Sequence, residues 1–398
     1  MLTTIYRKMV NTYKKRSRVG QLIFSLAVIF IILLSLHRST QPTLPFDVIS
    51  VHDQIFQVAW NSTGTYIAIA TYNEISIWSV FTKARTFATY NDEYISYMIW
   101  GPDDSLLAIV NAKGQIKVWE TASGNLVNTL NIGDDTWDNP GQTLNFLSAN
   151  EILYFSSSIS EGAYQVWEIS SGDRIVNLDM VAIALDILRD KILLATVDDK
   201  IWVVDHQQLT QPRFIVEHIG QINDVAWSPS GKYIASCGRD KNIHIWDIDR
   251  STLVKTLTLD NEPTGVFWNP ANDMLAIQTL TPDNERAVYV WQVSGQSSAE
   301  FVVSSRDRDY PERKALMWSP NGEYLGVLLK PQELPLGDDE YLFPPTWPND
   351  QLLIWNIDAK RPERLINIPA VLRSWAWKPD SSQVAVTNLG DKVLIFDV

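Results

Sequence analysis

After residue 40, the chain alternates short apolar runs with polar turns. The segment DVAWSPSGKYIASCGRDKNIHIWDID, residues 224–249, shows this pattern most clearly and closes on Trp246-Asp247. Sustained helical periodicity is hard to find in this part of the chain, whereas β-branched residues and tryptophan are frequent, with 16 tryptophans in all. The pattern predicts an all-β protein.

The same segment recurs along the chain. A first apolar run ends in an aromatic residue and a turn at VAWNSTG, MIWGPDD, VAWSPSG, VFWNPAN, LMWSPNG and WAWKPDS. A second run follows about nineteen residues later and closes at Trp78, Trp119, Trp167, Val204, Trp246, Trp291, Trp355 and Phe396. These positions are separated by 41, 48, 37, 42, 45, 64 and 41 residues. A period of about 40–45 residues is typical of a four-stranded propeller blade.

A single four-stranded sheet of this size cannot bury both of its faces. Arranged radially, each twisted sheet packs against its neighbours, and the apolar runs form a continuous ring of core. The eight second-run positions predict an eight-bladed β-propeller. Seven blades are an alternative, because ALDILRDKILLATVDDKIWVVD is short and lacks the turn motif. We expect Ser-Pro-x-Gly turns to join the first and second strands of the blades.

The last repeat ends at Val398 without an outermost strand, whereas residues 45–53 supply an alternating segment before the first complete repeat. We therefore expect a velcro closure, in which residues 46–51 pair with the strand at residues 392–398. Such a closure removes the exposed strand edges that favour aggregation.

The segment at residues 224–249 resembles the WD-repeat family, and the resemblance extends over residues 45–398. The resemblance implies a structural tetrad in which an aspartate accepts from a histidine, the histidine from a serine, and the serine hydroxyl from an indole N–H. His218, Ser236, Asp240 and Trp246 match its four positions. Other copies depart from it: the serine position is Ile69 in the first copy, and the tryptophan position is Val204 in the fourth. LMWSPNGEYLGVLL is also similar to TolB-type propellers, which have nearly the same architecture.

The N-terminal region predicts a membrane anchor. Residues 22–36 form an apolar stretch whose only polar members are Ser25 and Ser35, and with its flanks it approaches the thickness of a bilayer. Six cations precede it and only Arg38 follows closely, which places the N-terminus in the cytoplasm by the positive-inside rule. A cleaved signal peptide is the alternative, but no small-residue cleavage pattern follows the stretch. We divide the chain into a basic cytoplasmic tail (1–20), a transmembrane signal anchor (21–38), a linker (39–45) and a propeller (46–398) outside the cytoplasm.

Charge and cysteine content narrow the classes of partner and site. Residues 1–40 carry seven of the 33 cations and no acid, so residues 41–398 hold 26 cations against 46 acids, a charge of about −20. Such a surface repels phosphates, so we expect no nucleic acid partner. The single cysteine, Cys237, excludes an intrachain disulfide and a multi-cysteine metal site, and we expect it to be a small buried residue.

Three long connections are candidates for a binding face, because in the WD-repeat arrangement they share one face of the ring. They are residues 131–142, residues 304–314 and an insertion within residues 330–350. The candidate residues combine aromatic side chains with charges, as recognition surfaces do. They are Asp134, Asp135, Trp137, Asp138, Arg306, Arg308, Tyr310, Asp338, Asp339, Glu340, Tyr341, Phe343 and Trp347. The alternative is that the aromatic rings pack back onto the blades.

The sequence contains no motif typical of a hydrolase nucleophile, a zinc protease or a phosphate-binding loop. The acidic clusters lack a complete calcium-binding pattern, and we expect no metal or cofactor. We therefore expect a non-catalytic, membrane-tethered WD-repeat scaffold that binds a protein partner through one propeller face. The alternatives are an extracytoplasmic sensor or binding protein for a small ligand, peptide or glycan, and an enzyme built from scattered loop residues.

Overall fold

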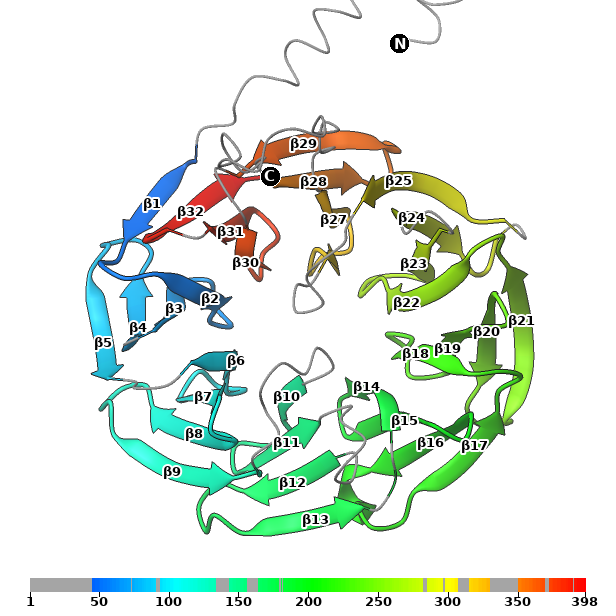
Figure 1. The fold of residues 1–398 in the computed structure, drawn as a ribbon, viewed down its shortest axis with the longest axis horizontal. Coiled ribbons are helices and arrows are strands. Elements are labelled where there is room, and N and C mark those ends of the chain that lie inside the picture. Colours follow the sequence, from blue (N-terminus) through cyan, green and yellow to red (C-terminus); the bar gives the residue numbers. More distant parts are fainter. Residues whose placement is uncertain are drawn as a thin grey trace, which may run out of the picture.

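The structure, a computed structural model, describes residues 45–398 except for 73, 91–93, 134–142, 156–163, 179, 181, 282–284, 296–297, 307–314, 330–349, 369–371 and 389. In this part of the chain, 32 strands form eight antiparallel four-stranded sheets arranged as a ring (Figure 1). The described residues contain one short 3-10 turn, at His206–Gln208. The predicted all-β, eight-bladed propeller is confirmed, and the seven-bladed alternative is wrong.

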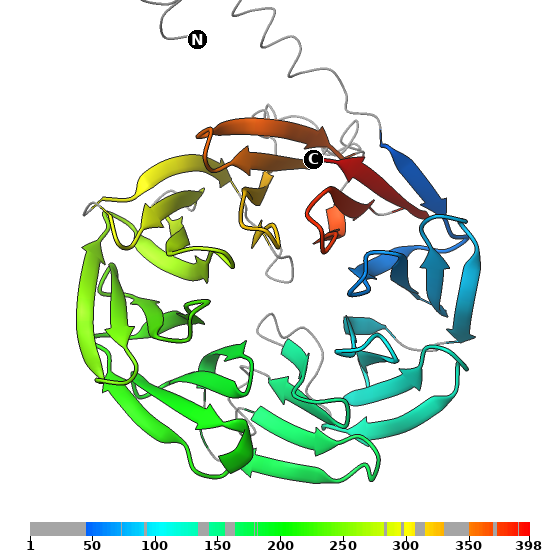
Figure 2. The ribbon, with the colours of Figure 1, turned by 180° about the vertical axis from the view of Figure 1, so that it is seen from behind.

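Seven blades are meanders, and in all eight the first strand lies nearest the axis of the ring and the fourth strand lies at the rim (Figures 1 and 2). In blade eight the outermost strand is β1. Blades one to four comprise β2(Ile55–Trp60), β3(Tyr66–Thr71), β4(Glu74–Ser79), β5(Arg85–Tyr90); β6(Ile95–Trp100), β7(Leu106–Asn111), β8(Gln115–Glu120), β9(Leu126–Asn131); β10(Thr143–Phe146), β11(Glu151–Phe155), β12(Tyr164–Glu168), β13(Arg174–Leu178); and β14(Ala182–Leu188), β15(Lys191–Thr196), β16(Lys200–Asp205), β17(Arg213–Glu217).

Blades five to eight comprise β18(Ile222–Trp227), β19(Tyr233–Gly238), β20(Asn242–Asp247), β21(Thr252–Thr258); β22(Glu262–Trp268), β23(Met274–Leu280), β24(Glu285–Gln292), β25(Glu300–Arg306); β26(Leu316–Trp318), β27(Tyr324–Leu329), β28(Gln351–Asn356), β29(Arg361–Asn367); and β30(Leu372–Trp377), β31(Gln383–Asn388), β32(Lys392–Asp397) with β1(Asp47–Ser50). Of the described residues, none form a helix that is both long and apolar enough to cross a membrane. The predicted anchor at residues 21–38 lies outside the described residues.

The predicted velcro closure is present. β1 pairs antiparallel with β32, with Asp47 opposite Ile395 and Ser50 opposite Lys392. The blue β1 and the red β32 lie side by side from both directions of view (Figures 1 and 2). The ends of the folded body therefore complete blade eight together, and β32 has no free edge.

The core is divided among the junctions between blades. Eight hydrophobic clusters were found among the described residues, and each one spans two consecutive blades. In the cluster that seals the ring, Ile49 and Ile395 of blade eight pack with Ile69 of blade one. Each sheet thus buries its faces against its neighbours, as the repeat pattern predicts.

A tryptophan hydrogen bond links blades at five of these junctions. The aromatic residue that ends the first strand donates its indole N–H to the preceding blade, at the carbonyl just before the equivalent aromatic residue. The pairs are Trp60–Ala376, Trp100–Ala59, Trp268–Ala226, Trp318–Phe267 and Trp377–Met317, with N–O distances of 2.8–3.3 Å. This recurring bond explains why the first apolar runs end in tryptophan.

The junction between blades four and five departs from this rule. Trp227 Nε1 is buried without a hydrogen-bond partner. The backbone N–H of Trp227 instead donates to the side chain of Asp186, at 2.7 Å. Blade four has Ile187 where other blades have the aromatic residue, and a bond from a backbone N–H to a carboxylate links the two blades here.

This difference supplies a matched pair of substitutions. We expect Trp268→Phe to lower the free energy of unfolding by about 1–2 kcal/mol more than Trp227→Phe, because only the first leaves a carbonyl unpaired while both remove the same ring volume. Denaturant unfolding of the two variants measures the difference. Equal losses would contradict a stabilising role for the indole bond.

Candidate functional site

The antiparallel strand order gives the propeller a loop face, which we define by two sets of connections. These are the connections that enter the first strand of each blade and those that join its second and third strands. The predicted candidate segments all belong to these sets, since they fall between β9 and β10, between β25 and β26, and between β27 and β28. Arg306 is the last residue of β25, and the other candidate residues in these segments lie outside the described residues.

A set of bulge residues on the first strands was not predicted. In six blades the pairing between first and second strands skips one residue near the start of the first strand. These residues are Phe56, Ser96, Ile183, Asn223, Thr264 and Arg373. Each is at least partly exposed and follows a buried residue. Bulges re-aim side chains and are frequent beside functional sites.

Two of the bulge residues belong to an aromatic cluster that joins three blades. The ring of Phe56 meets Tyr94 edge to face, with centroids 5.0 Å apart, and Tyr72 at 6.5 Å. The guanidinium carbon of Arg373 lies 5.7 Å from the centre of the Phe56 ring. Tyr72 follows β3 and Tyr94 precedes β6, so both belong to the loop face, and Tyr72 is 53% exposed. This arrangement can hold an apolar side chain of a partner beside a cation.

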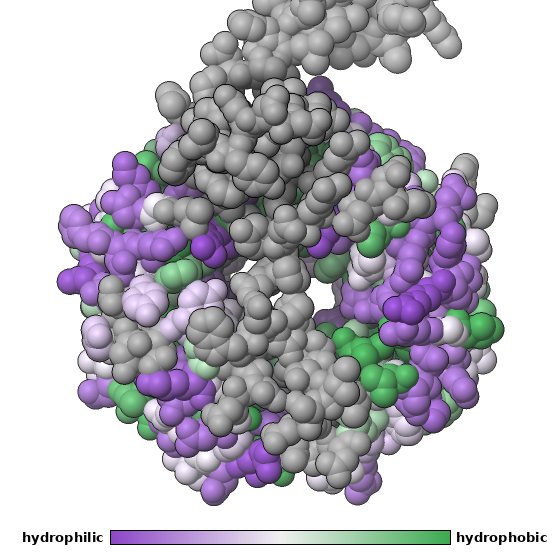
Figure 3. Space-filling view, viewed as in Figure 1, coloured by the Kyte–Doolittle hydropathy of each residue, from purple (hydrophilic) through white to green (hydrophobic). Residues whose placement is uncertain are grey.

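Exposed aliphatic side chains add to the same face. Val197 lies between β15 and β16 and is 54% exposed, and Ile219 lies between β17 and β18 and is 78% exposed. Figure 3 shows apolar surface over blades four and five among largely hydrophilic surroundings. The loop face therefore carries apolar groups at two separate places, on blades one and two and on blades four and five.

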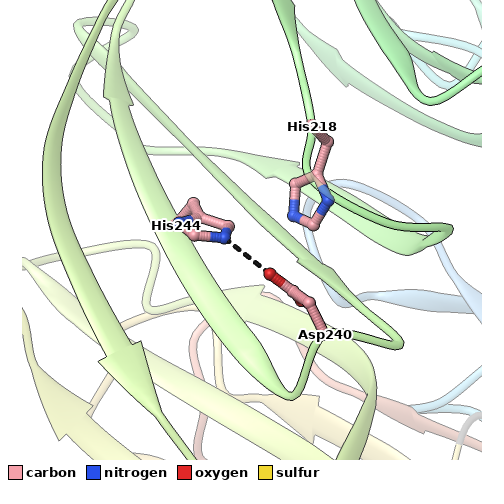
Figure 4. Close-up of side chains that lie close together, drawn as sticks. All are labelled: His218, Asp240 and His244. Atoms are coloured by element: carbon pink, nitrogen blue, oxygen red, sulfur yellow. Dashed lines mark hydrogen bonds and ion pairs between the residues drawn. The ribbon is translucent and has the colours of Figure 1, made fainter.

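The structural tetrad of blade five is only partly as predicted. Trp246 donates its indole N–H to the hydroxyl of Ser236 at 2.8 Å, as expected. The bonds expected for His218 are wrong: its Nδ1 lies 3.0 Å from the carbonyl oxygen of Gly220, and its Nε2 is buried without a partner. Asp240 is bonded to His244 instead, 2.9 Å from Nε2 (Figure 4). Burial therefore brings a second histidine into the group, because His244 shares a strand face with Trp246.

Other blades keep the tryptophan bond with a different acceptor. Trp78 donates to Ser76, and Trp167 donates to Gln165, each two residues earlier on the same strand. The loss of the serine in the second strand is thus compensated within the third strand in these two blades.

Two buried carboxylates lie on neighbouring first strands of blades four and five. Asp224 accepts from the backbone N–H groups of Val225 and Val266, and Asp186 from those of Ile187 and Trp227. Burial raises the pKa of Asp186 to about 6, although the hydrogen bonds oppose it. Burial, with a smaller contribution from the Asp186 charge, raises the pKa of Asp224 to about 7. These acids bind one blade to the next.

Charged groups in the histidine cluster have shifted pKa values as well. Burial lowers the pKa of His218, which favours the neutral ring. Burial acts to raise the pKa of Asp240, but hydrogen bonds from Asn242 and His244 outweigh it and leave the pKa lowered. Cys237 is a free, buried thiol, as predicted, and burial raises its pKa.

The chain is similar to WD-repeat domains and proteins in each comparison of its sequence. The family described as "WD domain, G-beta repeat" matches residues 210–247, and the family "Anaphase-promoting complex subunit 4 WD40 domain" matches residues 72–149. Human "WD repeat-containing protein 36" is 27% identical over 55% of this chain, and "WD40 repeat-containing protein HOS15" of Arabidopsis thaliana is 26% identical over 66% of it. The matched regions span 23% and 42% of those two relatives.

Solved structures show the same fold. The C-terminal WD40 domain of Sif2 superposes with a TM-score of 0.64 at 13% identity, and the match covers 90% of this chain and 99% of that domain. The computationally designed protein Ika8 gives a TM-score of 0.60 at 15% identity, over 90% of this chain and 100% of its own. At these identities the likeness concerns the fold alone.

The raised pKa of Asp186 predicts that this residue lowers the free energy of unfolding by an amount that grows as the pH rises. Between pH 4 and pH 6 the folded chain holds a proton that the unfolded chain has released, so the free energy of unfolding falls as pH rises through this window. We expect Asp186→Asn to gain about 2–3 kcal/mol relative to the unsubstituted protein between pH 4 and pH 7, at about 1.4 kcal/mol per pKa unit.

Denaturant unfolding at pH 4, 5, 6 and 7 measures this gain, and Asp249→Asn, at an exposed acid of the neighbouring blade, is the control. A difference between Asp186→Asn and the unsubstituted protein that stays constant with pH would contradict the assignment.

Proposed function

We propose, because the chain belongs to the WD-repeat family of β-propellers, that it is a non-catalytic scaffold that binds a protein partner through its loop face. The observation that carries the proposal is the aromatic cluster of Phe56, Tyr72 and Tyr94 with Arg373 above Phe56. It combines the residue types that dominate binding energy at protein interfaces, and its members lie on two first strands and two loop-face connections of three blades.

The cluster is better suited to recognition than to packing. Tyr72 is more than half exposed although it lies beside another aromatic ring. Arg373 Nε is buried without a hydrogen-bond partner. A bound segment that places an apolar side chain against the rings would cover the exposed Tyr72, and a carboxylate of the same segment would be attracted by the guanidinium charge.

The repeat architecture favours a scaffold over an enzyme. Among the described residues, a ring of sheets that packs blade against blade holds the ends of its connections in fixed positions. The sequence has none of the hydrolase, zinc protease or phosphate-loop motifs sought, and propellers of this family are generally interaction platforms. The matched relatives are longer than the regions they share with this chain, so their activities and partners are not assigned to it.

Membrane tethering through residues 21–38 is part of the proposal. Its support is the apolar stretch at residues 22–36 and the cations that precede it. In this arrangement residues 1–20 lie in the cytoplasm, and the propeller lies on the other side of a single-pass anchor. A reporter fused after Val398 tests the orientation: activity that requires the cytoplasm would contradict it.

The loop-face proposal predicts a difference between two faces of one blade. The partner is captured by crosslinking the intact protein in its own membrane, and its affinity is then measured for purified variants. We expect Phe56→Ala and Tyr72→Ala each to weaken binding at least tenfold, the loss of about 1.4 kcal/mol typical of an interface hot spot.

The matched control is Phe81→Ala, because Phe81 is 95% exposed and lies between the third and fourth strands of the same blade, on the opposite face. We expect that variant to bind as the unsubstituted protein does. If the affinity fell for Phe81→Ala but not for Phe56→Ala and Tyr72→Ala, the interface would lie on the opposite face and the proposal would be contradicted.

A further inference from the structure

Three metal-ligating side chains meet at the loop-face end of blade five. His218 lies in the connection from β17 to β18, Asp240 in the connection from β19 to β20, and His244 in β20. One ligand atom from each lies within 4.8 Å of the other two. In a tetrahedral zinc site with bonds of about 2.0–2.1 Å, ligand atoms are about 3.4 Å apart, so an ion fits after shifts of about 1 Å.

The free nitrogen of His218 is the second observation that points to a ligand. A carbonyl oxygen can only accept, so the 3.0 Å contact with Gly220 places the proton on Nδ1. Nε2 of the neutral ring then carries a lone pair that accepts no hydrogen bond. This atom is buried, and the residue as a whole is only 4% exposed. It faces Asp240 and His244 (Figure 4).

His218 already has the arrangement of a zinc ligand. Metal-bound histidines almost always donate their other N–H to a carbonyl or carboxylate, which fixes the ring orientation. His244 has the same possibility, because its Nδ1 lies 3.0 Å from the hydroxyl of Thr256. When Nε2 of His244 binds an ion, its proton moves to Nδ1 and is donated to Thr256.

The surrounding charges suit a divalent cation. Asp240 supplies one carboxylate at the cluster, and the charge of Asp199 acts on His218 from the neighbouring blade. Asp199 also has a buried oxygen, Oδ1, without a hydrogen-bond partner. Two carboxylates therefore balance the charge of one divalent ion, and both histidines remain neutral.

We propose that His218 and His244, through Nε2, and Asp240, through a carboxylate oxygen, bind one zinc ion. Two imidazoles and a carboxylate are a donor set suited to zinc, and three protein ligands leave a fourth position for water. The ion joins two loop-face connections to the third strand of blade five. It takes the place of the hydrogen bonds that were expected between His218 and the other tetrad residues. This site is independent of the proposed partner-binding cluster on blades one, two and eight.

Zinc titration of the full-length chain in detergent, in competition with a chromophoric chelator, tests the proposal. We expect one ion per chain and at least a 100-fold weaker affinity for His218→Asn and His244→Asn. The controls are His52→Asn, at an exposed histidine, and His206→Asn, at a histidine paired with Glu151. Absence of stoichiometric zinc binding, or equal affinity in His218→Asn and the unsubstituted protein, would overturn the site.

Two further measurements decide the matter if the histidine variants do not fold. X-ray absorption of the zinc-loaded, unsubstituted chain should show two imidazoles, and zinc bound without imidazole would overturn the proposal. Thr256→Val, at an exposed position, should keep the fold and lower zinc affinity about 10–100-fold, as loss of an outer partner does. Unchanged affinity in that variant would contradict the assigned role of Nδ1.

Discussion

The structure depends on burial between neighbouring sheets. Among the described residues, each of the eight hydrophobic clusters spans two consecutive blades, so the core is shared between neighbouring sheets. Each sheet is therefore stable only while both neighbours are present, and this requirement is met for every sheet only in a closed ring. The pairing of β1 with β32 completes the last blade and supplies the missing strand.

Polar bonds at the junctions give this packing a defined register. An indole N–H reaches a backbone carbonyl of the preceding blade at five junctions, and Asp186 performs a related task where the indole bond is missing. Such bonds are directional, whereas apolar burial is not, so they fix the position of one sheet relative to the next. The loop face inherits this rigidity, which lets residues of three blades form one aromatic cluster.

Much of the fold could be predicted because the repeat is written in apolar residues. The spacing of the eight residues that close the second runs predicts the number of blades, and the unpaired segment at residues 46–51 predicts the closure. The site was less accessible. Phe56 and Arg373 emerge from bulges, which depend on pairing between strands, although both stand four residues before the closing tryptophan, a regularity visible in the sequence.

The histidine cluster shows a different limit. His218 and Asp240 were identified from the resemblance, but the Gly220 carbonyl sets the orientation of the His218 ring, and no spacing of residue types reveals that contact. His244 takes part because the packing of blade five brings it to Asp240, a contact that the sequence does not predict. Burial thus decides which polar groups meet, after the pattern has decided which strands form.

A disulfide across the closure tests the central claim most directly. Val48 lies opposite Leu394 in the pairing of β1 with β32, and Cys237, the native cysteine, is buried. In the double variant Val48→Cys/Leu394→Cys, mild oxidation of the folded chain should form the bond quantitatively and raise the unfolding temperature, because opposed strand positions satisfy disulfide geometry. A bond that forms only after the chain has been unfolded would contradict a closed ring.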